Sequence, residues 1–389
     1  MSKIKVNSLE GVGASTPAIT IDNSSGTCTA NLTNRKGKNL VVNGAMKIAQ
    51  RQTSSTSSSY QTVDMVEMHY SGTDEAPTQA QVDVASGTTP YTLGFRKAFS
   101  ITNGNQTSGA GTADYIWIQM HQEAQNIANS GWNYLSSSSN ITLSFWIKSS
   151  VAQDFKGYLR SKDSTNYMYP FATGSLSADT WTKVTKTISG NSNLVFNNDN
   201  EAGMQINILA FYGTDVTDNS VTENAWATYS SSARMKDNTS TWYTTNDATL
   251  QITGVQLEVS DHATDFEHLS FAEDLRKCQR YFFRVPYQGV SNGGGVYLGS
   301  GKETGSNARV AVVFPVPMRA LPACAASNLL ADDESSATSA NTVSSVLGST
   351  VEPDRARVEF SGGSYSGGNS ISLATGQTTN SYLEGSAEL

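Results

Sequence analysis

The feature that most constrains the fold is a series of short segments in which apolar and polar residues alternate, separated by turns rich in glycine and serine. In residues 114–121 and 140–148, large apolar residues occupy every second position. This alternation predicts β-strands with one buried face, because successive side chains of a strand point to opposite faces of its sheet. Many such strands and few helices predict an all-β protein built on a jelly-roll β-sandwich.

Other segments between residues 40 and 265 follow the same pattern. We expect further strands at 91–101, 154–160, 180–188, 203–212 and 248–259. Serine-rich composition predicts loops at 51–60 and 136–139, and a short helix fits 122–129. The jelly-roll domain is therefore predicted to span residues 41–269.

The best predicted helix covers residues 270–283 and forms a joint at 270–285. Ser270 and Glu273 make a capping box, which satisfies amide groups that the first turn leaves free. Helical spacing then predicts one apolar stripe, made of Phe271, Leu275, Cys278 and Phe282. We expect Phe271, Leu275 and Phe282 to be buried.

The two ends of the chain differ from the central domain. Residues 286–389 are predicted to form a second, smaller β domain, with strands at 295–299, 308–316, 355–360, 370–374 and 380–384 and a polar loop at 331–350. Residues 1–40 contain short alternating segments that are too short to bury a core alone. We expect this N-terminal segment to be a short β anchor that pairs with other chains.

Composition excludes several classes of protein. Only 15% of residues are charged, and the 26 basic residues are unclustered, which argues against nucleic-acid binding. No apolar run approaches the ~20 residues of a membrane helix, and the N-terminus lacks the apolar core of a signal peptide. The three cysteines are far apart, which excludes a disulfide framework and a structural zinc site.

Catalytic chemistry is weakly represented. The chain has four histidines and no nucleophile elbow, HExxH motif or P-loop. Glu273 and Asp274 are explained by the helix start, and Asp64 and Glu67 are predicted to fall on opposite faces of a strand. We therefore expect no catalytic residues, no enzymatic activity and no cofactor, although the oxygen-rich turn 197–201 could hold a structural calcium ion.

The strand phase indicates a candidate binding face. On three predicted strands, the positions opposite the apolar phase mix aromatic rings with hydrogen-bonding groups, a mixture that suits sugars. We predict a glycan-binding face that carries Tyr115, Trp117, Gln119, His121, Trp146, Lys148, Tyr158 and Arg160. The alternative is that Trp117 and Trp146 pack under a second layer made by terminal segments, by residues 331–350 or by a neighbouring chain.

Several motifs resemble bacteriophage tail-fibre proteins. NLVVNGAMKIAQR (39–51) and YQTVDMVEM (60–68) resemble the opening of their sandwich domain, and LSFWIKSS (143–150) and TWTKVTKTISG (180–190) resemble its central strands. The most specific similarity is at 252–284, where a strand and a Thr-x-Phe-Glu turn precede a short helix that ends in Cys-Gln-Arg-Tyr. The segments 312–322 and 385–389 also resemble segments of these fibre proteins. The family usually has Asp-Arg-Trp where this chain has Asp64-Met65-Val66, so the chain is a diverged member.

This resemblance implies a receptor-binding protein of the phage tail whose jelly roll is similar to carbohydrate-binding modules. It implies a homotrimer, attached to other virion proteins through residues 1–40 and bound without catalysis to host polysaccharide or lipopolysaccharide. Such a protein would be made in the host cytoplasm without a signal peptide. Two alternatives stay open: a structural virion component (a head fibre or tail adaptor) without a receptor, and, less favoured, a glycan depolymerase.

Overall fold

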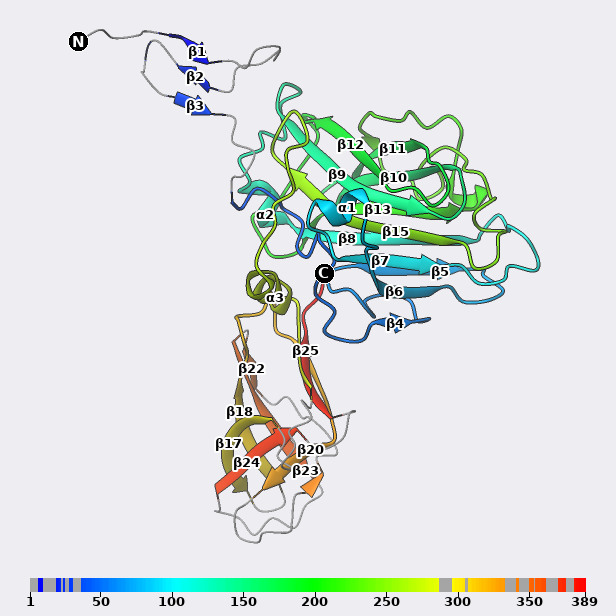
Figure 1. The fold of residues 1–389 in the computed structure, drawn as a ribbon. Coiled ribbons are helices and arrows are strands. Elements are labelled where there is room, and N and C mark those ends of the chain that lie inside the picture. The colour runs from blue at the N-terminus through cyan, green and yellow to red at the C-terminus, as the bar shows by residue number, and fades with distance from the viewer. Residues whose placement is uncertain are drawn as a thin grey trace.

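The structure of the protein is a computed structural model (Figure 1). It describes residues 6–9, 19–21, 24, 28–30, 36–286, 296–304, 307–332, 341–342, 350–352, 354–361, 370–375 and 381–389. The largest part is a sandwich of two six-stranded sheets, from which a slender β region extends (Figure 1). All strand pairs of the sandwich are antiparallel, so the predicted all-β sandwich is confirmed.

One sheet of the sandwich, which we call the β8 sheet, has the order β14-β11-β10-β13-β8-β5. Its strands are β5 (Glu67–Ser71), β8 (Tyr115–Glu123), β10 (Asp154–Ser161), β11 (Tyr167–Ser175), β13 (Ala202–Tyr212) and β14 (Ala227–Thr228). In β8 the apolar phase faces the core, since Ile116, Ile118 and Met120 are fully buried. The other phase of β8 therefore faces outward.

The second sheet, which we call the β9 sheet, has the order β12-β9-β15-β7-β6-β4. Its strands are β4 (Ser54–Ser55), β6 (Thr78–Asp83), β7 (Lys97–Thr102), β9 (Asn140–Ser149), β12 (Thr182–Ser189) and β15 (Thr249–Glu258). Phe145 of β9 and Phe171 of β11 meet in the core, with ring centroids 6.4 Å apart. The two sheets thus share one apolar core between them.

The short helices of the sandwich are α1 (Thr89–Thr92), α2 (Ala124–Ala128) and the 3-10 turn η1 (Thr214–Val216). The strand predicted at 91–101 is wrong over its first part, because α1 precedes β7 there. Pro90 fits the first turn of a helix, and Gly94 follows with φ +99°, a conformation that ends regular structure. The helix predicted at 122–129 corresponds to α2.

Helix α3 (Phe271–Gln279) keeps the predicted capping box but not the predicted buried face. Phe271 is 62% exposed and Leu275 is half-buried, so the prediction that both are buried is wrong. Asp274 and Cys278 face inward instead, because the Asp274 carboxylate pairs with Lys47 Nζ at 2.6 Å. The helix also ends earlier than predicted, and Phe282, which is buried as expected, begins the next strand.

Two smaller sheets form the region beyond α3. The three-stranded sheet β16-β25-β19 contains β16 (Phe282–Pro286), β19 (Ala323–Ser327) and β25 (Tyr382–Ser386). The seven-stranded sheet has the order β21-β20-β24-β17-β18-β23-β22, with β17 (Tyr297–Thr304), β18 (Asn307–Val313), β20 (Leu329–Asp332), β21 (Asn341–Thr342), β22 (Thr350–Glu352), β23 (Arg355–Ser361) and β24 (Ser370–Thr375). A separate apolar cluster packs here. Most of the loop predicted at 331–350 lies outside the described residues.

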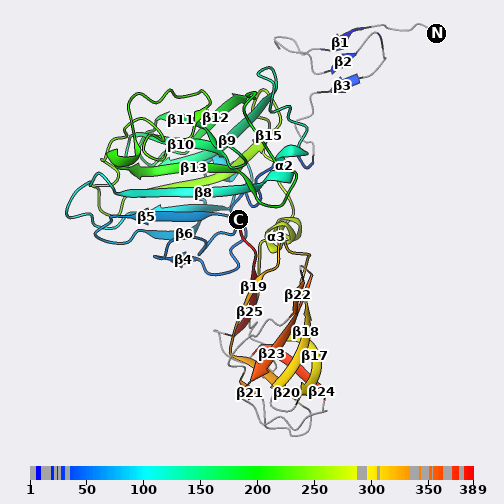
Figure 2. The same cartoon turned by 180° about the vertical axis from the view of Figure 1, so that it is seen from behind.

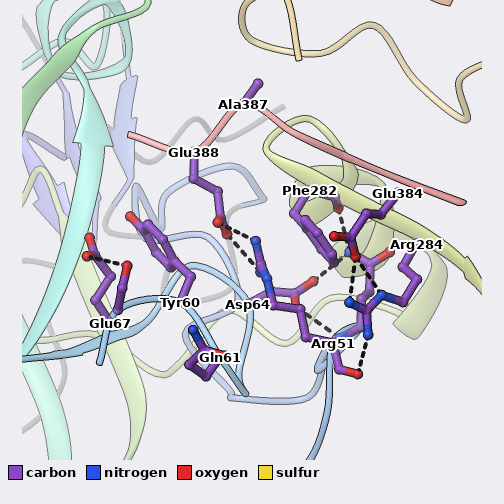
Figure 3. A network of polar contacts seen from close by, with 12 residues as sticks. Arg51, Tyr60, Gln61, Asp64, Glu67, Phe282, Arg284, Glu384, Ala387 and Glu388 are labelled. Carbon is purple, nitrogen blue, oxygen red and sulfur yellow. Dashed lines mark hydrogen bonds and ion pairs between the residues drawn. The ribbon is translucent and has the colours of Figure 1, made fainter. Parts of the chain in front are cut away.

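A polar network joins the C-terminal residues to the sandwich, as Figure 3 shows. The Arg51 guanidinium donates two hydrogen bonds to the Glu388 carboxylate and lies 3.4 Å from the centre of the Phe282 ring. Arg284 donates to Glu384 and to the Arg51 carbonyl oxygen (2.8 Å). The chain therefore returns to the sandwich at its end, beside α3 (Figure 2).

At the N-terminal end, β1 (Ser8–Leu9), β2 (Ile19–Ile21) and β3 (Cys28–Ala30) form a three-stranded antiparallel sheet. This sheet lies apart from the sandwich in both views (Figures 1 and 2). The predicted domain boundaries at 41, 270 and 286 stay predictions. Within the described part of the chain, no helix combines the length and apolarity needed to cross a membrane.

Candidate functional site

The predicted site residues lie on two sheets and not on one face. Six belong to the β8 sheet: Tyr115, Trp117, Gln119, His121, Tyr158 and Arg160. Trp146 and Lys148 belong to β9, in the other sheet. The outward faces of the two sheets point in opposite directions, because their inward faces share one core. The prediction of one continuous face is therefore wrong, since alternation gives a side chain's direction but not its sheet.

Aromatic side chains gather on the outward face of the β8 sheet, which we call the β8 face. The rings of Tyr115 and Trp117 lie 4.6 Å apart between centroids, and both are half-buried. Tyr212 of β13 meets the Trp117 ring edge-on at 5.3 Å, and His69 of β5 stacks on its other side at 4.9 Å. These rings form a partly exposed apolar platform across three neighbouring strands.

Two arginines border this platform. The Arg234 guanidinium, from the loop after β14, lies 5.9 Å from the centre of the Trp117 ring and 5.4 Å from that of Tyr212. The same guanidinium is 5.9 Å from the Tyr229 ring, and Arg160 of β10 lies 3.6 Å from that ring. The loop that carries Tyr229 and Arg234 therefore brings one positive charge to the edge of the platform, and its Tyr229 ring stacks with a second, Arg160 of β10.

The same loop buries one of the predicted residues. Tyr158 is 3% exposed, its hydroxyl lies 3.3 Å from that of Tyr212, and it packs in a small cluster with Met235. Burial raises the pKa of Tyr158. The prediction that Tyr158 presents its ring to a ligand is wrong, because residues of its own domain cover it.

A strip of amides continues the β8 face beside the platform. Gln119 Nε2 donates to Asn207 Oδ1 at 3.1 Å, and Gln205 Nε2 approaches His121 Nδ1 at 3.5 Å. Among the described residues, Gln205 Oε1 and Trp117 Nε1 are buried atoms without a hydrogen-bond partner. Both atoms are shielded from solvent, and the two residues lie four strand positions apart along the sheet, so they are not one site.

His121 takes part in a buried acid cluster and is only 7% exposed, so it is not an open ligand contact as predicted. Its Nε2 lies 3.0 Å from Glu67 Oε1, and His69 Nε2 lies 2.9 Å from Glu67 Oε2. Burial alone would raise the pKa of Glu67, but the hydrogen bonds from the two histidines outweigh it and lower the pKa to about 2. Glu67 is therefore an ionised structural group that orients both rings.

Asp64 has a different environment from Glu67. It precedes β5 and is 1% exposed, and its carboxylate accepts hydrogen bonds from the Gln50 amide nitrogen (3.0 Å) and Nε2 (2.6 Å). Burial raises the pKa of Asp64 despite these bonds. The two acids that the sequence placed on opposite faces of one strand therefore belong to separate structural networks.

The outward face of the β9 sheet is covered differently. Trp146 packs at the edge of an apolar cluster whose buried members are Ala45, Val84, Phe95 and Ala98. Lys148 Nζ lies 5.5 Å from the centre of the Trp181 ring. Trp146 therefore packs under a layer, as the alternative interpretation proposed, but this layer comes from the same domain.

A cleft of about 280 Å³ with a mixed polar and apolar lining opens beside the aromatic platform. Tyr212 lines the cleft, together with Thr112, Thr217, Asp237, Asn238 and Ser240. The Asp237 carboxylate accepts hydrogen bonds from Thr217 Oγ1 (2.6 Å) and Asn219 Nδ2 (2.8 Å). This volume is slightly below the ~300–1,000 Å³ of typical small-ligand pockets.

The turn 197–201, considered for calcium, makes protein contacts in the structure. Asn198 Oδ1 accepts from Asn129 Nδ2 (2.7 Å), and Asn200 Nδ2 donates to the Arg319 carbonyl oxygen. In the part of the chain that the structure describes, no three acidic, histidine or cysteine side chains converge as metal ligands would. The turn therefore helps to attach the C-terminal region to the sandwich.

Some residues of the β8 face were not among the predicted ones. Gln205 and Asn207 alternate with the buried Met204, Ile206 and Ile208. The same alternation that identified β8 could have identified them. Tyr229 and Arg234 come from a loop without periodicity, so no sequence signal predicts that they meet the sheet.

No protein-family model matches this sequence, and no curated protein matches it. Among solved structures, the chain is similar to the enzymatically active domain of tailspike protein 4 of bacteriophage CBA120, with 9% identity and a TM-score of 0.29. That match covers 57% of this chain and 21% of the phage domain, so the chain spans about a fifth of that domain's length.

Two carbohydrate-binding modules are also similar to the chain. For a family 30 module, the identity is 12% and the TM-score 0.29, with 61% of this chain and 95% of the module covered. For a family 11 module from Clostridium thermocellum, the identity is 9% and the TM-score 0.24, with 52% of this chain and 91% of the module covered.

Proposed function

We propose that the protein is a fibre component of a phage virion that attaches the particle to host surface glycans by non-catalytic binding through the β8 face. The observation that carries the proposal is the combination on this face of half-buried rings with a half-buried hydrogen-bonding side chain. Tyr115 and Trp117 supply the rings, and Gln119 supplies an amide. Sugars use both, because their C–H faces stack on rings and their hydroxyls bond amides.

The state of the nearby carboxylates supports binding without cleavage. A glycosidase needs one carboxyl group as an acid and another as a base or nucleophile beside the sugar. Glu67 is held between two histidines, and Asp64 is bound by Gln50. Glu123 accepts hydrogen bonds from Arg280 and Tyr281. Each of these carboxylates is buried and engaged in structural bonds.

The assembly part of the proposal rests on the N-terminal region and on the resemblance to phage fibres. Leu9, in a small sheet that lies apart from the sandwich, is 50% exposed, and Val6, which precedes that sheet, is 38% exposed. We propose that residues 1–40 anchor the protein to other virion proteins and that it is a homotrimer. Sedimentation equilibrium tests the trimer. Deleting residues 1–40 should leave a protein that binds cells but is not built into particles, and normal assembly of the deletion variant would contradict the anchor.

Binding to a panel of purified bacterial polysaccharides and lipopolysaccharides tests the function. We expect the wild-type protein to bind at least one of them without releasing reducing ends. The variant Trp117→Ala should lose that binding, whereas Trp146→Ala, the matched change on the opposite sheet, should keep it. Equal binding by Trp117→Ala would place the site elsewhere, and release of reducing ends would show a depolymerase.

The second candidate function is a structural virion component without a receptor. The observation that favours it is the cover over part of the β8 face, where Tyr158 and Tyr212 are buried by the loop after β14. A structural component would bind none of the panel and would still be required for particle assembly. Retained binding to host envelope would exclude it.

A further inference from the structure

Two cations on the β8 face share one aromatic ring. Arg160 of β10 lies 3.6 Å from the centre of the Tyr229 ring, and Arg234 lies 5.9 Å from the same centre. Both side chains are partly exposed. Guanidinium groups stack on aromatic faces and keep their N–H donors at the edge, so such a ring holds an arginine in place without neutralising it.

Among the described residues, the hydrogen-bond partners of these two guanidiniums are neutral groups. When the Asn166 side-chain amide is turned so that its oxygen faces Arg160, it accepts a hydrogen bond from Arg160 Nη2 at 2.7 Å. Arg234 donates to the Ser231 carbonyl and to the Tyr212 hydroxyl, both at 3.2 Å. In the described residues, neither arginine forms an ion pair with a carboxylate. An arginine has five N–H donors, so each retains donors for a further partner.

Several other cations of the sandwich form ion pairs. Lys156, two strand positions from Tyr158, contacts both Asp154 (2.8 Å) and Glu223 (3.0 Å). Arg280 pairs with Glu123 at 2.7 Å. The chain has 34 acidic and 26 basic residues, so acids are available to pair with cations. Two half-buried arginines without acids therefore mark a local positive site on a negatively charged protein.

Lys162 adds to this positive site. It follows Arg160 by two positions, and its pKa is lowered by burial and by the charge of Arg160. The part of the β8 face beside these cations carries the Trp117 ring and the amide strip. A ligand on this face would meet apolar, neutral polar and cationic groups together, and an anion would be attracted over several ångströms.

We propose that Arg160 and Arg234 select an acidic saccharide, in which carboxylate or phosphate substituents bind the guanidiniums while the sugar stacks on the Tyr115–Trp117 platform. This inference rests on the proposed function and names its substrate class. Arginine forms paired, charge-assisted hydrogen bonds with both kinds of oxyanion. These bonds are stronger at a half-buried site than in water, because the surrounding protein screens charge less.

The test compares matched polysaccharides. A panel of acidic bacterial polysaccharides is immobilised beside carboxyl-reduced and dephosphorylated copies, and binding is measured by biolayer interferometry. We expect wild-type protein to bind a native acidic member and to bind its neutralised copy at least tenfold more weakly. Which treatment abolishes binding distinguishes a carboxylate from a phosphate. Raising the salt concentration should also weaken binding to the native polymer.

Two pairs of variants assign the effect to the site. Arg160→Gln and Arg234→Gln should each weaken binding about tenfold, the effect of losing a charge-assisted hydrogen bond. Arg160→Lys and Arg234→Lys should keep part of the preference for acidic polymers, because the charge remains. The control is Arg96→Gln, on the other side of the sandwich. Arg96 is also stacked on a tyrosine, because its guanidinium lies 3.9 Å from the centre of the Tyr91 ring. Melting curves confirm that each variant folds.

The outcomes separate this inference from the proposed function. Binding of wild-type protein to neutralised copies with unchanged affinity would overturn acidic selection and leave glycan binding intact. The inference would also be overturned if both glutamine variants kept the full preference for acidic polymers, or if Arg96→Gln lost that preference. Absence of binding to every polysaccharide, native or neutralised, would overturn the proposed function itself.

Discussion

Glu123 is fully buried where β8 ends, and its ion pair with Arg280 links the sandwich to the end of α3. The carboxylate accepts from Arg280 Nε (2.7 Å) and Nη2 (2.9 Å) and from the Tyr281 hydroxyl (2.6 Å). Burial would raise the pKa of Glu123, but these bonds and one from Gln125 lower it. We predict that Arg280→Met destabilises the sandwich, because it leaves a buried carboxylate without its counter-charge.

The magnitude follows from the environment of each partner. Removing one member of a buried ion pair costs about 3–5 kcal/mol. Arg280 is 34% exposed, and Tyr281 and Gln125 still donate to the carboxylate in the variant. We therefore expect the lower end, about 3 kcal/mol, which corresponds to a fall in melting temperature of about 6–12 °C for a domain of this size.

Urea unfolding followed by circular dichroism measures this loss, and a double-mutant cycle isolates the pair. Glu123→Gln combined with Arg280→Met should be more stable than Arg280→Met alone, because the buried charge is gone. A loss below about 1 kcal/mol for Arg280→Met, or no recovery in the double variant, would refute the reasoning.

Three further predictions concern stability. The pKa of Glu67 is lowered from 4.5 to about 2, so ionised Glu67 should contribute about 3 kcal/mol to the free energy of unfolding. This contribution should be present above pH 4.5 and lost as the pH falls through 2. Acid unfolding of the variant Glu67→Gln should lack this pH-dependent loss. Burial raises the pKa of Glu388 to about 8, although the Arg51 charge lowers it. The free energy of unfolding should therefore fall as the pH rises from 4.5 to 8. The variant Glu388→Gln should show a smaller change in unfolding free energy over this pH range. Phe271→Ser should leave the melting temperature nearly unchanged, whereas Phe282→Ala should cost about 3–5 kcal/mol; equal effects would show that α3 packs otherwise.

Alternation in the sequence predicted the strands well because burial against one core imposes a period of two. The phases of 114–121 and 140–148 were correct, with Ile118 and Phe145 fully buried as the pattern requires. Alternation has no information about which sheet a strand joins, since both sheets face the same core. Trp117 and Trp146 were therefore assigned to one face, although they lie on opposite sides of the sandwich.

Contacts between distant segments account for the remaining differences. The loop that covers Tyr158 has no periodic pattern, and the pairing of Glu67 with His121 depends on strand register across 54 positions of sequence separation. Helical spacing placed Phe271 in an apolar stripe, but the Lys47–Asp274 ion pair turns another face of α3 inward. Such pairings depend on tertiary structure and leave no local signal.

A crystal structure with a bound oligosaccharide is the most direct test of the central claim. The oligosaccharide would be cut from whichever polysaccharide the protein retains in the binding panel. We predict sugar density on the β8 face, with one ring against Trp117 and hydrogen bonds to Gln119. Density against Trp146 and Lys148, or in the seven-stranded sheet beyond α3, would contradict it.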